Sequence, residues 1–273
     1  PYDKKLSSEF SKFLTKDLLS NHKLTPELRT RMVDWMIEVM SIYGCSNETF
    51  FLSVHIMDLF INKTNKTLED GHIHLIGMVS MFIATKFEEI YPIRLREMAI
   101  KIGHRQYNES AFKQMERIIL NTIGMENIVS TSTYEFIKDY FYDCSYNNKE
   151  RLVDPKFKTF FEYVKETSIF LSKLICHFER FYKKDACFNS LAIIIAAIEI
   201  TMEKTKDLCS NENGIFLQAW VKYLINQNDY STEELSSQAK EIIEAYNEYF
   251  SLKGISQNLK IFSPLSFLPK GGH

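Results

Sequence analysis

Few side chains in this sequence have the type and spacing of a catalytic or metal site. Glu88 and Glu89 are adjacent acids, but neighbouring helical positions point about 100° apart and make a poor acid and base pair. His72 and His74 lie two positions apart at an expected helix start, and no nearby cysteine or acidic set completes a metal site. The sequence has no P-loop, dinucleotide-binding glycines, His-Glu-x-x-His or Gly-x-Ser-x-Gly. We therefore expect no catalytic residues, no metal and no cofactor.

The cysteines also lack the spacing of a functional site. They are odd in number and widely scattered: Cys45, Cys144, Cys176, Cys187 and Cys209. We interpret them as buried thiols in a reducing compartment. No apolar run reaches the roughly 20 residues needed to cross a bilayer, and no signal-type stretch opens the sequence. We expect a soluble intracellular protein and, because the sequence begins at Pro1 rather than methionine, part of a longer chain.

The composition favours a globular, helical protein. Of the 273 residues, 45% are hydrophobic and 14% aromatic, which supplies the apolar area for two domains. The 9 glycines and 6 prolines are too few for a sheet of many hairpins or a glycine-lined nucleotide site. The formal net charge of −2 provides no cationic field for nucleic acid or an anionic membrane. We therefore expect a partner that is recognised locally.

Helical periodicity predicts a leading helix at residues 4–19 and a first set of five helices after it. Thr25-Pro26-Glu27 combines an N-cap, a proline at the first helical position and an acid in the first turn, so a helix begins here. Gly77 lies inside a later helix and permits close approach of a neighbour, which indicates the centre of a bundle. Gly124 is typical of a helix stop. The five helices are expected near residues 26–43, 47–61, 71–87, 93–102 and 109–123.

A second set of five helices follows a linker of small polar residues. Its central helix, at 186–200, is apolar and carries Ala192, Ala196 and Ala197, which resembles the small-residue character of the central helix in the first set. The set is expected near 133–143, 155–179, 184–203, 215–226 and 232–250. The sequence therefore predicts an all-α fold with an N-terminal helix (1–24), two tandem five-helix domains (25–129 and 130–250) and a tail (251–273).

Two segments resemble the cyclin family. Leu28-Arg29-Thr30-Arg31-Met32-Val33-Asp34-Trp35 resembles the opening of the cyclin box, and Lys86-Phe87-Glu88-Glu89-Ile90-Tyr91-Pro92 resembles its most recognisable segment. Five positions that define the box appear in order as Arg29, Asp58, Leu75, Lys86 and Glu116. The tail at 259–262, with Pro264 nearby, resembles the C-terminus of mitotic cyclins, so the A/B-type group is favoured. The resemblance implies two tandem cyclin-box domains and a non-catalytic regulatory subunit.

The resemblance implies a surface that binds a cyclin-dependent protein kinase and a structural ion pair between Arg29 and Asp58. On that surface Lys86 and Glu116 orient one another and bond to backbone groups of the partner's regulatory helix. From the residues alone, an exposed lysine and glutamate of little energetic weight, and apolar residues of an ordinary core, are the better interpretation, and only the family resemblance favours a binding surface. The kinase-binding residues implied are Lys86, Phe87, Glu88, Glu89, Glu116, Leu120, Met125 and Ile128.

The resemblance also implies a groove that docks substrates or inhibitors bearing an Arg-x-Leu motif. Leu28, Met32, Trp35, Ile73 and His74 would form the groove, and Glu38 would meet the cation of the motif. Ordinary core packing is the alternative for this stripe. Arg31 stands where relatives place an aliphatic residue, and it either weakens the attraction of Glu38 for a basic motif, pairs with Glu38 or points to solvent.

Three other classes of protein compete with this interpretation. An enzyme is disfavoured because the sequence contains none of the catalytic motifs named above. A nucleic-acid-binding protein resembling transcription factor IIB would need a basic face, which this sequence lacks. A helical scaffold that binds no kinase would leave the coincidence of Lys86 with Glu116 unexplained. We expect a cyclin-dependent kinase activator that acts in cell-cycle progression at G2/M. It is expected in the nucleus and cytoplasm, with no nucleic-acid or membrane partner.

Overall fold

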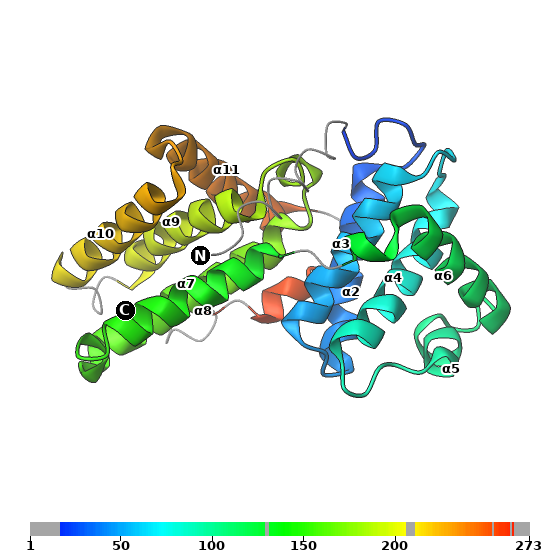
Figure 1. Cartoon of the computed structure of the whole chain (residues 1–273), viewed down its shortest axis with the longest axis horizontal. Coiled ribbons are helices and arrows are strands. Elements are labelled where there is room, and N and C mark those ends of the chain that lie inside the picture. The colour runs from blue at the N-terminus through cyan, green and yellow to red at the C-terminus, as the bar shows by residue number, and fades with distance from the viewer. Residues whose placement is uncertain (1–16, 129–130, 206–210, 253, 263, 265–273) are drawn as a thin grey trace. The chain divides into compact units, whose positions relative to one another are not determined.

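The computed structural model describes residues 17–128, 131–205, 211–252, 254–262 and 264 (Figure 1). Within these ranges every regular element is helical, apart from an isolated parallel bridge between Lys23 and Glu69. The helices form two compact units. Unit 1 comprises Pro1–Ser132 with Cys176–Lys183 and Gly254–Asn258, and unit 2 comprises Thr133–Ile175, Lys184–Lys253 and Leu259–His273. The prediction of an all-α fold is confirmed.

Unit 1 is built from helices whose ends are set by local capping. The Thr25 side chain accepts a hydrogen bond from the Leu28 amide, and Asn108 accepts one from the Ala111 amide at 2.8 Å. Gly124 ends the last helix with a φ of 79°, a left-handed conformation that favours glycine. The helices are α2 (Pro26–Ile42), α3 (Asn47–Lys63), α4 (Ile73–Glu88), α5 (Leu95–Glu97), which continues into a π-helical turn at Met98–Ile102, and α6 (Glu109–Ile123).

Helix α4 is the centre of unit 1 and packs against α2, α3 and α6. Gly77 allows the close approach, because a Cβ added there would overlap the side chain of Met32 on α2. Ser80 and Ala84 on the same helix are also fully buried. The small residues that the sequence places inside this helix therefore do lie at helix crossings.

Unit 2 repeats this arrangement around α9. The helices are α7 (Thr133–Asn147), α8 (Pro155–Ile175), α9 (Ala186–Lys204), α10 (Asn211–Asn228) and α11 (Thr232–Ser251). Helix α9 contacts each of the other four, and Ala192, Ala196 and Ala197 are fully buried. By length and composition α9 also qualifies as a membrane span, although the sequence analysis expects none. Because 72% of its apolar window is buried in the fold, it has the character of a central core helix.

Several predicted helix limits are wrong. Helix α7 continues to Asn147 rather than ending near residue 143, and α10 begins at Asn211 rather than near residue 215. Helix α8 ends at Ile175 rather than near residue 179, and the chain beyond it is held by Arg29 Nη1 and Thr30 Oγ1, which donate to the carbonyls of Cys176 (2.9 Å) and His177 (2.7 Å). The predicted leading helix lies mostly outside the described residues, and its last part, at Leu18 and Leu19, is a turn.

Candidate functional site

A buried ion pair fixes the base of the first candidate site. Arg29 Nε and Nη2 donate to the two Asp58 carboxylate oxygens at 2.8 Å and 2.6 Å, joining α2 to α3. Burial alone would lower the pKa of the Arg29 guanidinium, but the charge and hydrogen bonds of Asp58 outweigh it and raise the pKa. The third bond of Arg29, to the Cys176 carbonyl, was not foreseen from the sequence. Arg29 therefore holds three segments of unit 1 together.

Lys86 and Glu116 form an ion pair that joins the end of α4 to α6. Both side chains are partly exposed, and Lys86 Nζ also lies 4.4 Å from the centre of the Phe82 ring. Phe87 (45% exposed) and Met125 (57% exposed) are apolar residues at the surface, whereas Leu120 is half-buried. We call Lys86, Phe87, Glu116, Leu120 and Met125 the α4–α6 face.

Two residues expected on the kinase-binding surface are used inside unit 1 instead. Ile128 is fully buried, so in this structure it packs in the core and offers no surface to a partner. The Glu89 carboxylate accepts hydrogen bonds from the Ser46 amide (2.7 Å) and the Thr49 hydroxyl (2.5 Å) at the start of α3. Burial acts to raise the pKa of Glu89, but these hydrogen bonds outweigh it and lower the pKa. Glu89 therefore caps a helix, whereas Glu88, its neighbour in the motif, is exposed.

Two exposed apolar residues that follow α4 were not among the kinase-binding residues that the resemblance implies. Ile90 and Tyr91 are 88% and 91% exposed, although large apolar side chains gain free energy from burial. They belong to the segment 86–92 that carries the family resemblance, so the motif itself contained the signal. Together with Phe87 they give the segment 86–92 three exposed apolar side chains.

The second candidate site lies on α2 beside the start of α4. Met32 and Ile73 are buried, and Leu28 and Trp35 are half-buried above them. The Trp35 and His74 ring centres are 5.1 Å apart, and the ring of Tyr107, which the sequence did not indicate, lies tilted against His74 at 5.9 Å. Burial lowers the pKa of His74, so the ring favours its neutral form. The family resemblance implies a docking groove at Leu28, Met32, Trp35, Ile73 and His74, and we call these five residues the Trp35 groove.

The charged residues beside the Trp35 groove have different surroundings. Glu38 is exposed, and its Oε2 accepts a hydrogen bond from Asn258 Nδ2 at 3.3 Å. Arg31 is exposed, and in the part of the chain that the structure describes no ion pair joins it to Glu38. Asp34 is buried between them, 3.5 Å from His177 Nε2. The possibility that Arg31 pairs with Glu38 is therefore not realised.

The described cysteines and acids offer no catalytic or metal-binding cluster. No group of three or more potential metal ligands occurs among the described residues, and Cys45, Cys144, Cys176 and Cys187 form no disulfide. Burial raises the pKa of Cys45 to about 11, with a contribution from Glu89, and that of Cys144 to about 12. These two thiols therefore stay protonated near neutral pH and are poor nucleophiles.

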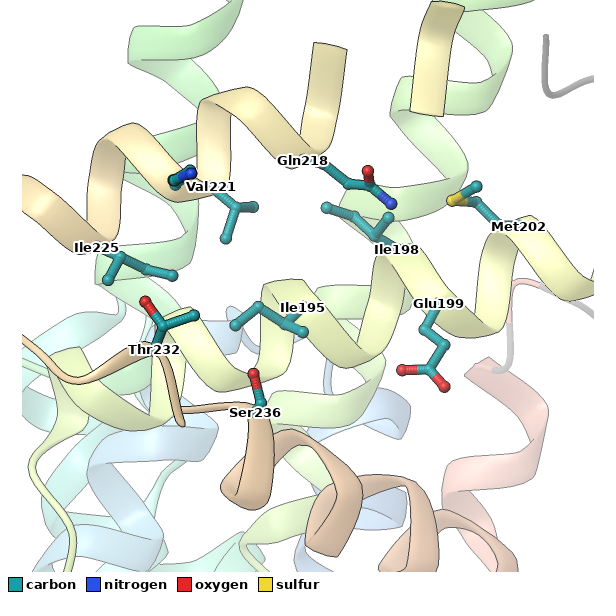
Figure 2. Close-up of a pocket in the computed structure, with 10 residues that line it drawn as sticks. Ile195, Ile198, Glu199, Met202, Gln218, Val221, Ile225, Thr232 and Ser236 are labelled. Atoms are coloured by element: carbon teal, nitrogen blue, oxygen red, sulfur yellow. The ribbon is translucent and has the colours of Figure 1, made fainter. Parts of the chain in front are cut away.

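Unit 2 contains a cavity of about 590 Å³ beside its central helix. Figure 2 shows Val221 and Ile225 of α10 pointing toward Ile195 and Ile198 of α9. Glu199, Thr232 and Ser236 also line the cavity, without a histidine, cysteine or second acid beside them. The lining therefore suits apolar contact rather than acid and base chemistry.

The sequence is similar to a known protein family and to named relatives. Residues 2–126 match the family described as Cyclin, N-terminal domain. The G2/mitotic-specific cyclin-B3 of Mus musculus is 32% identical over 136 residues, covering 50% of this chain and 10% of that protein. The G2/mitotic-specific cyclin-A of Spisula solidissima is 28% identical over 207 residues, covering 76% of this chain and 42% of that protein. The chain thus spans less than half the length of either relative.

The fold is shared with a solved cyclin structure. The X-ray structure of a viral cyclin from herpesvirus saimiri superposes with a TM-score of 0.56 at 14% sequence identity. The match covers 87% of this chain and 97% of the viral chain. The helical architecture is therefore common to both proteins.

Proposed function

Since this chain is a member of the cyclin family, with relatives named as A-type and B3 cyclins, we propose that it binds and activates a cyclin-dependent protein kinase. The observation that carries the proposal is the partly exposed Lys86–Glu116 ion pair, with Phe87 and Met125 exposed on the same α4–α6 face. An ion pair bordered by unburied apolar side chains is typical of a surface that becomes covered. The prediction of a non-catalytic protein agrees with this family membership.

The proposed mechanism is positional. Lys86 and Glu116 hold each other in place, so their remaining hydrogen-bonding capacity is oriented before a partner arrives. The α4–α6 face would hold the glutamate-bearing helix of the kinase inward, where that glutamate pairs with the ATP-orienting lysine of the kinase. Preferential binding to this conformation shifts the kinase toward its active state.

We further propose that the Trp35 groove docks substrates or inhibitors with an Arg-x-Leu motif. Trp35 and Leu28 are half-buried and offer apolar contact area above Met32 and Ile73. Glu38 is exposed on the same helix, one turn beyond Trp35, and its carboxylate suits the cation of the motif. Recruitment through this groove would add to kinase activation and leave the chemistry to the kinase.

The proposed setting is cell-cycle progression at G2/M, in the nucleus and cytoplasm, without nucleic-acid or membrane partners. The mitotic names of the relatives support the stage. The near balance of 33 basic and 35 acidic residues opposes a role like that of transcription factor IIB, which requires a basic face. Strong DNA binding at moderate salt would favour that second role.

The test is to mix the protein with candidate cyclin-dependent kinases and to measure co-elution and phosphorylation of a histone-type substrate. We expect activation by the wild type and a clear loss with Lys86→Ala or Glu116→Ala. Lys101→Ala is the matched control, because Lys101 forms an exposed ion pair with Glu97 at 3.0 Å outside the α4–α6 face. The proposal fails if no kinase is activated, or if all three variants behave as the wild type does.

A separate measurement tests the docking groove. We expect Trp35→Ala to reduce phosphorylation of motif-bearing substrates while a peptide substrate without the motif is phosphorylated as before. An equal loss on both substrates would contradict the docking role.

A further inference from the structure

The segment Gly254–Asn258 lies against α2 beside the Trp35 groove and belongs to unit 1. The Asn258 side-chain amide donates to the Asp34 carbonyl and to Asp34 Oδ2, each at 3.2 Å, and lies 3.3 Å from Glu38 Oε2. The Asn258 backbone amide donates to Asp34 Oδ2 at 3.2 Å. Because Asp34 is buried, these bonds anchor Asn258 to a fixed part of the helix.

Asn258 restrains a side chain that would otherwise be mobile. Glu38 is exposed, and Asn258 is its only hydrogen-bond donor among the described residues. An unrestrained exposed glutamate samples several rotamers, and ordering it on binding costs conformational entropy. The bond engages Oε2 alone, so Oε1 stays available, and a neutral amide leaves the negative charge of Glu38 uncompensated.

The other end of the segment contacts the second charged residue beside the groove. Arg31 and Glu38 flank Trp35 at four and three positions, so the three residues lie along one side of α2. Gly254 has a φ of 80°, and a Cβ added there would lie 3.1 Å from Arg31 Nη2. A glycine at this point thus lets the guanidinium pack against the backbone of the segment.

We propose that Gly254–Asn258 forms one edge of the Trp35 groove and that Asn258 is a positioning residue, which holds Glu38 ready for the cation of a docking peptide. This inference rests on the docking function proposed above and adds a specificity-determining element far from α2 in sequence. Selectivity for a cation then depends on a residue that does not itself contact the cation.

The test compares two labelled peptides on the full chain: one with an Arg-x-Leu motif, and one in which norleucine replaces the arginine. We expect Asn258→Ala to weaken binding of the arginine peptide about fivefold, the size expected for one lost hydrogen bond, and to leave the norleucine peptide unchanged. The ratio of the two Kd values does not depend on the folded fraction of the protein. Asn258→Leu, which keeps the side-chain volume without the donors, should change the ratio equally.

Ser256→Ala is the matched control, because Ser256 is an exposed residue of the same segment. We expect it to leave both Kd values as in the wild type. If the wild type prefers the arginine peptide and Asn258→Ala keeps that preference, or weakens both peptides equally, the positioning role is overturned while docking stands. If the wild type binds neither peptide more tightly than Trp35→Ala does, docking itself fails, and the positioning role with it.

Discussion

Replacing Arg29 with alanine should destabilise unit 1 far more than any exposed substitution described above. The change removes two hydrogen bonds from Asp58 and one from the Cys176 carbonyl, and it leaves the Asp58 carboxylate buried without its cation. Removing one partner of a buried ion pair costs about 3–5 kcal/mol. Since ~1 kcal/mol shifts the melting temperature of a chain of this size by about 2–4 °C, we expect a drop of roughly 10 °C.

The two tryptophans allow this loss to be assigned to unit 1. Trp35 lies in α2 and Trp220 in α10, so a Trp220→Phe background leaves Trp35 as the reporter in urea unfolding followed by fluorescence. Lys86→Ala is the control in the same background, because breaking a partly exposed pair costs about 1 kcal/mol or less. The reasoning would be refuted if Arg29→Ala and Lys86→Ala cost the same.

A double variant separates the two contributions to this loss. Arg29→Met with Asp58→Leu removes both charges and replaces them with apolar side chains, which is often nearly neutral for a buried pair. The Cys176 carbonyl still loses its donor, at about 1–3 kcal/mol. We therefore expect the double variant to be more stable than Arg29→Ala and less stable than the wild type. A double variant less stable than Arg29→Ala would mean that the uncompensated Asp58 charge is not the main cost.

Two further predictions concern packing and pH. Gly77→Ala should lower the free energy of unfolding by about 1–3 kcal/mol, because its Cβ overlaps Met32. In urea denaturation the same change should cost less in a Met32→Ala background than in the wild type, and an equal cost in both would contradict the overlap. Burial lowers the pKa of His55 from its usual 6.5, so its contribution to stability is complete above that pH and is lost as the pH falls toward the lower folded value. The urea midpoint of the wild type should therefore decrease as the pH is lowered from 7.5 to 5.5, and His55→Gln should make this decrease smaller. If the decrease is the same in the variant, groups other than His55 cause it.

The helices themselves were predictable because their limits follow from neighbouring residues. Thr25 with Pro26, Asn108 and Gly124 each mark a helix end through a local hydrogen bond or a local φ angle. The contacts that follow α8 could not be predicted, because the carbonyls of Cys176 and His177 accept hydrogen bonds from Arg29 and Thr30, which lie 147 residues away in the sequence. A periodic pattern carries no information about such a distant donor.

In the candidate sites, too, the contacts between residues far apart in the sequence could not be predicted from local patterns. The position of Lys86 relative to Glu116 came with the family resemblance, and the structure pairs them. Ile128 and Glu89 resemble surface residues by position, but one turns into the core and the other caps α3. Asn258 gave no signal, because nothing near it in the sequence indicates Asp34 or Glu38, at separations of 224 and 220 residues.

The discontinuity of unit 1 has a consequence for the order in which the chain acquires structure during synthesis. Its last contributing segment, Gly254–Asn258, leaves the ribosome long after α2 to α6, because all of unit 2 up to Lys253 is synthesised first. Until residue 176 has emerged, Arg29 lacks one of its acceptors, and until residue 258 has emerged, Asp34 lacks its Asn258 donors. Contacts between such distant residues carry a high loop-closure cost and slow folding. The nascent first unit therefore lacks these contacts until residue 258 has been made, and an incompletely assembled unit of this kind exposes apolar surface that favours aggregation.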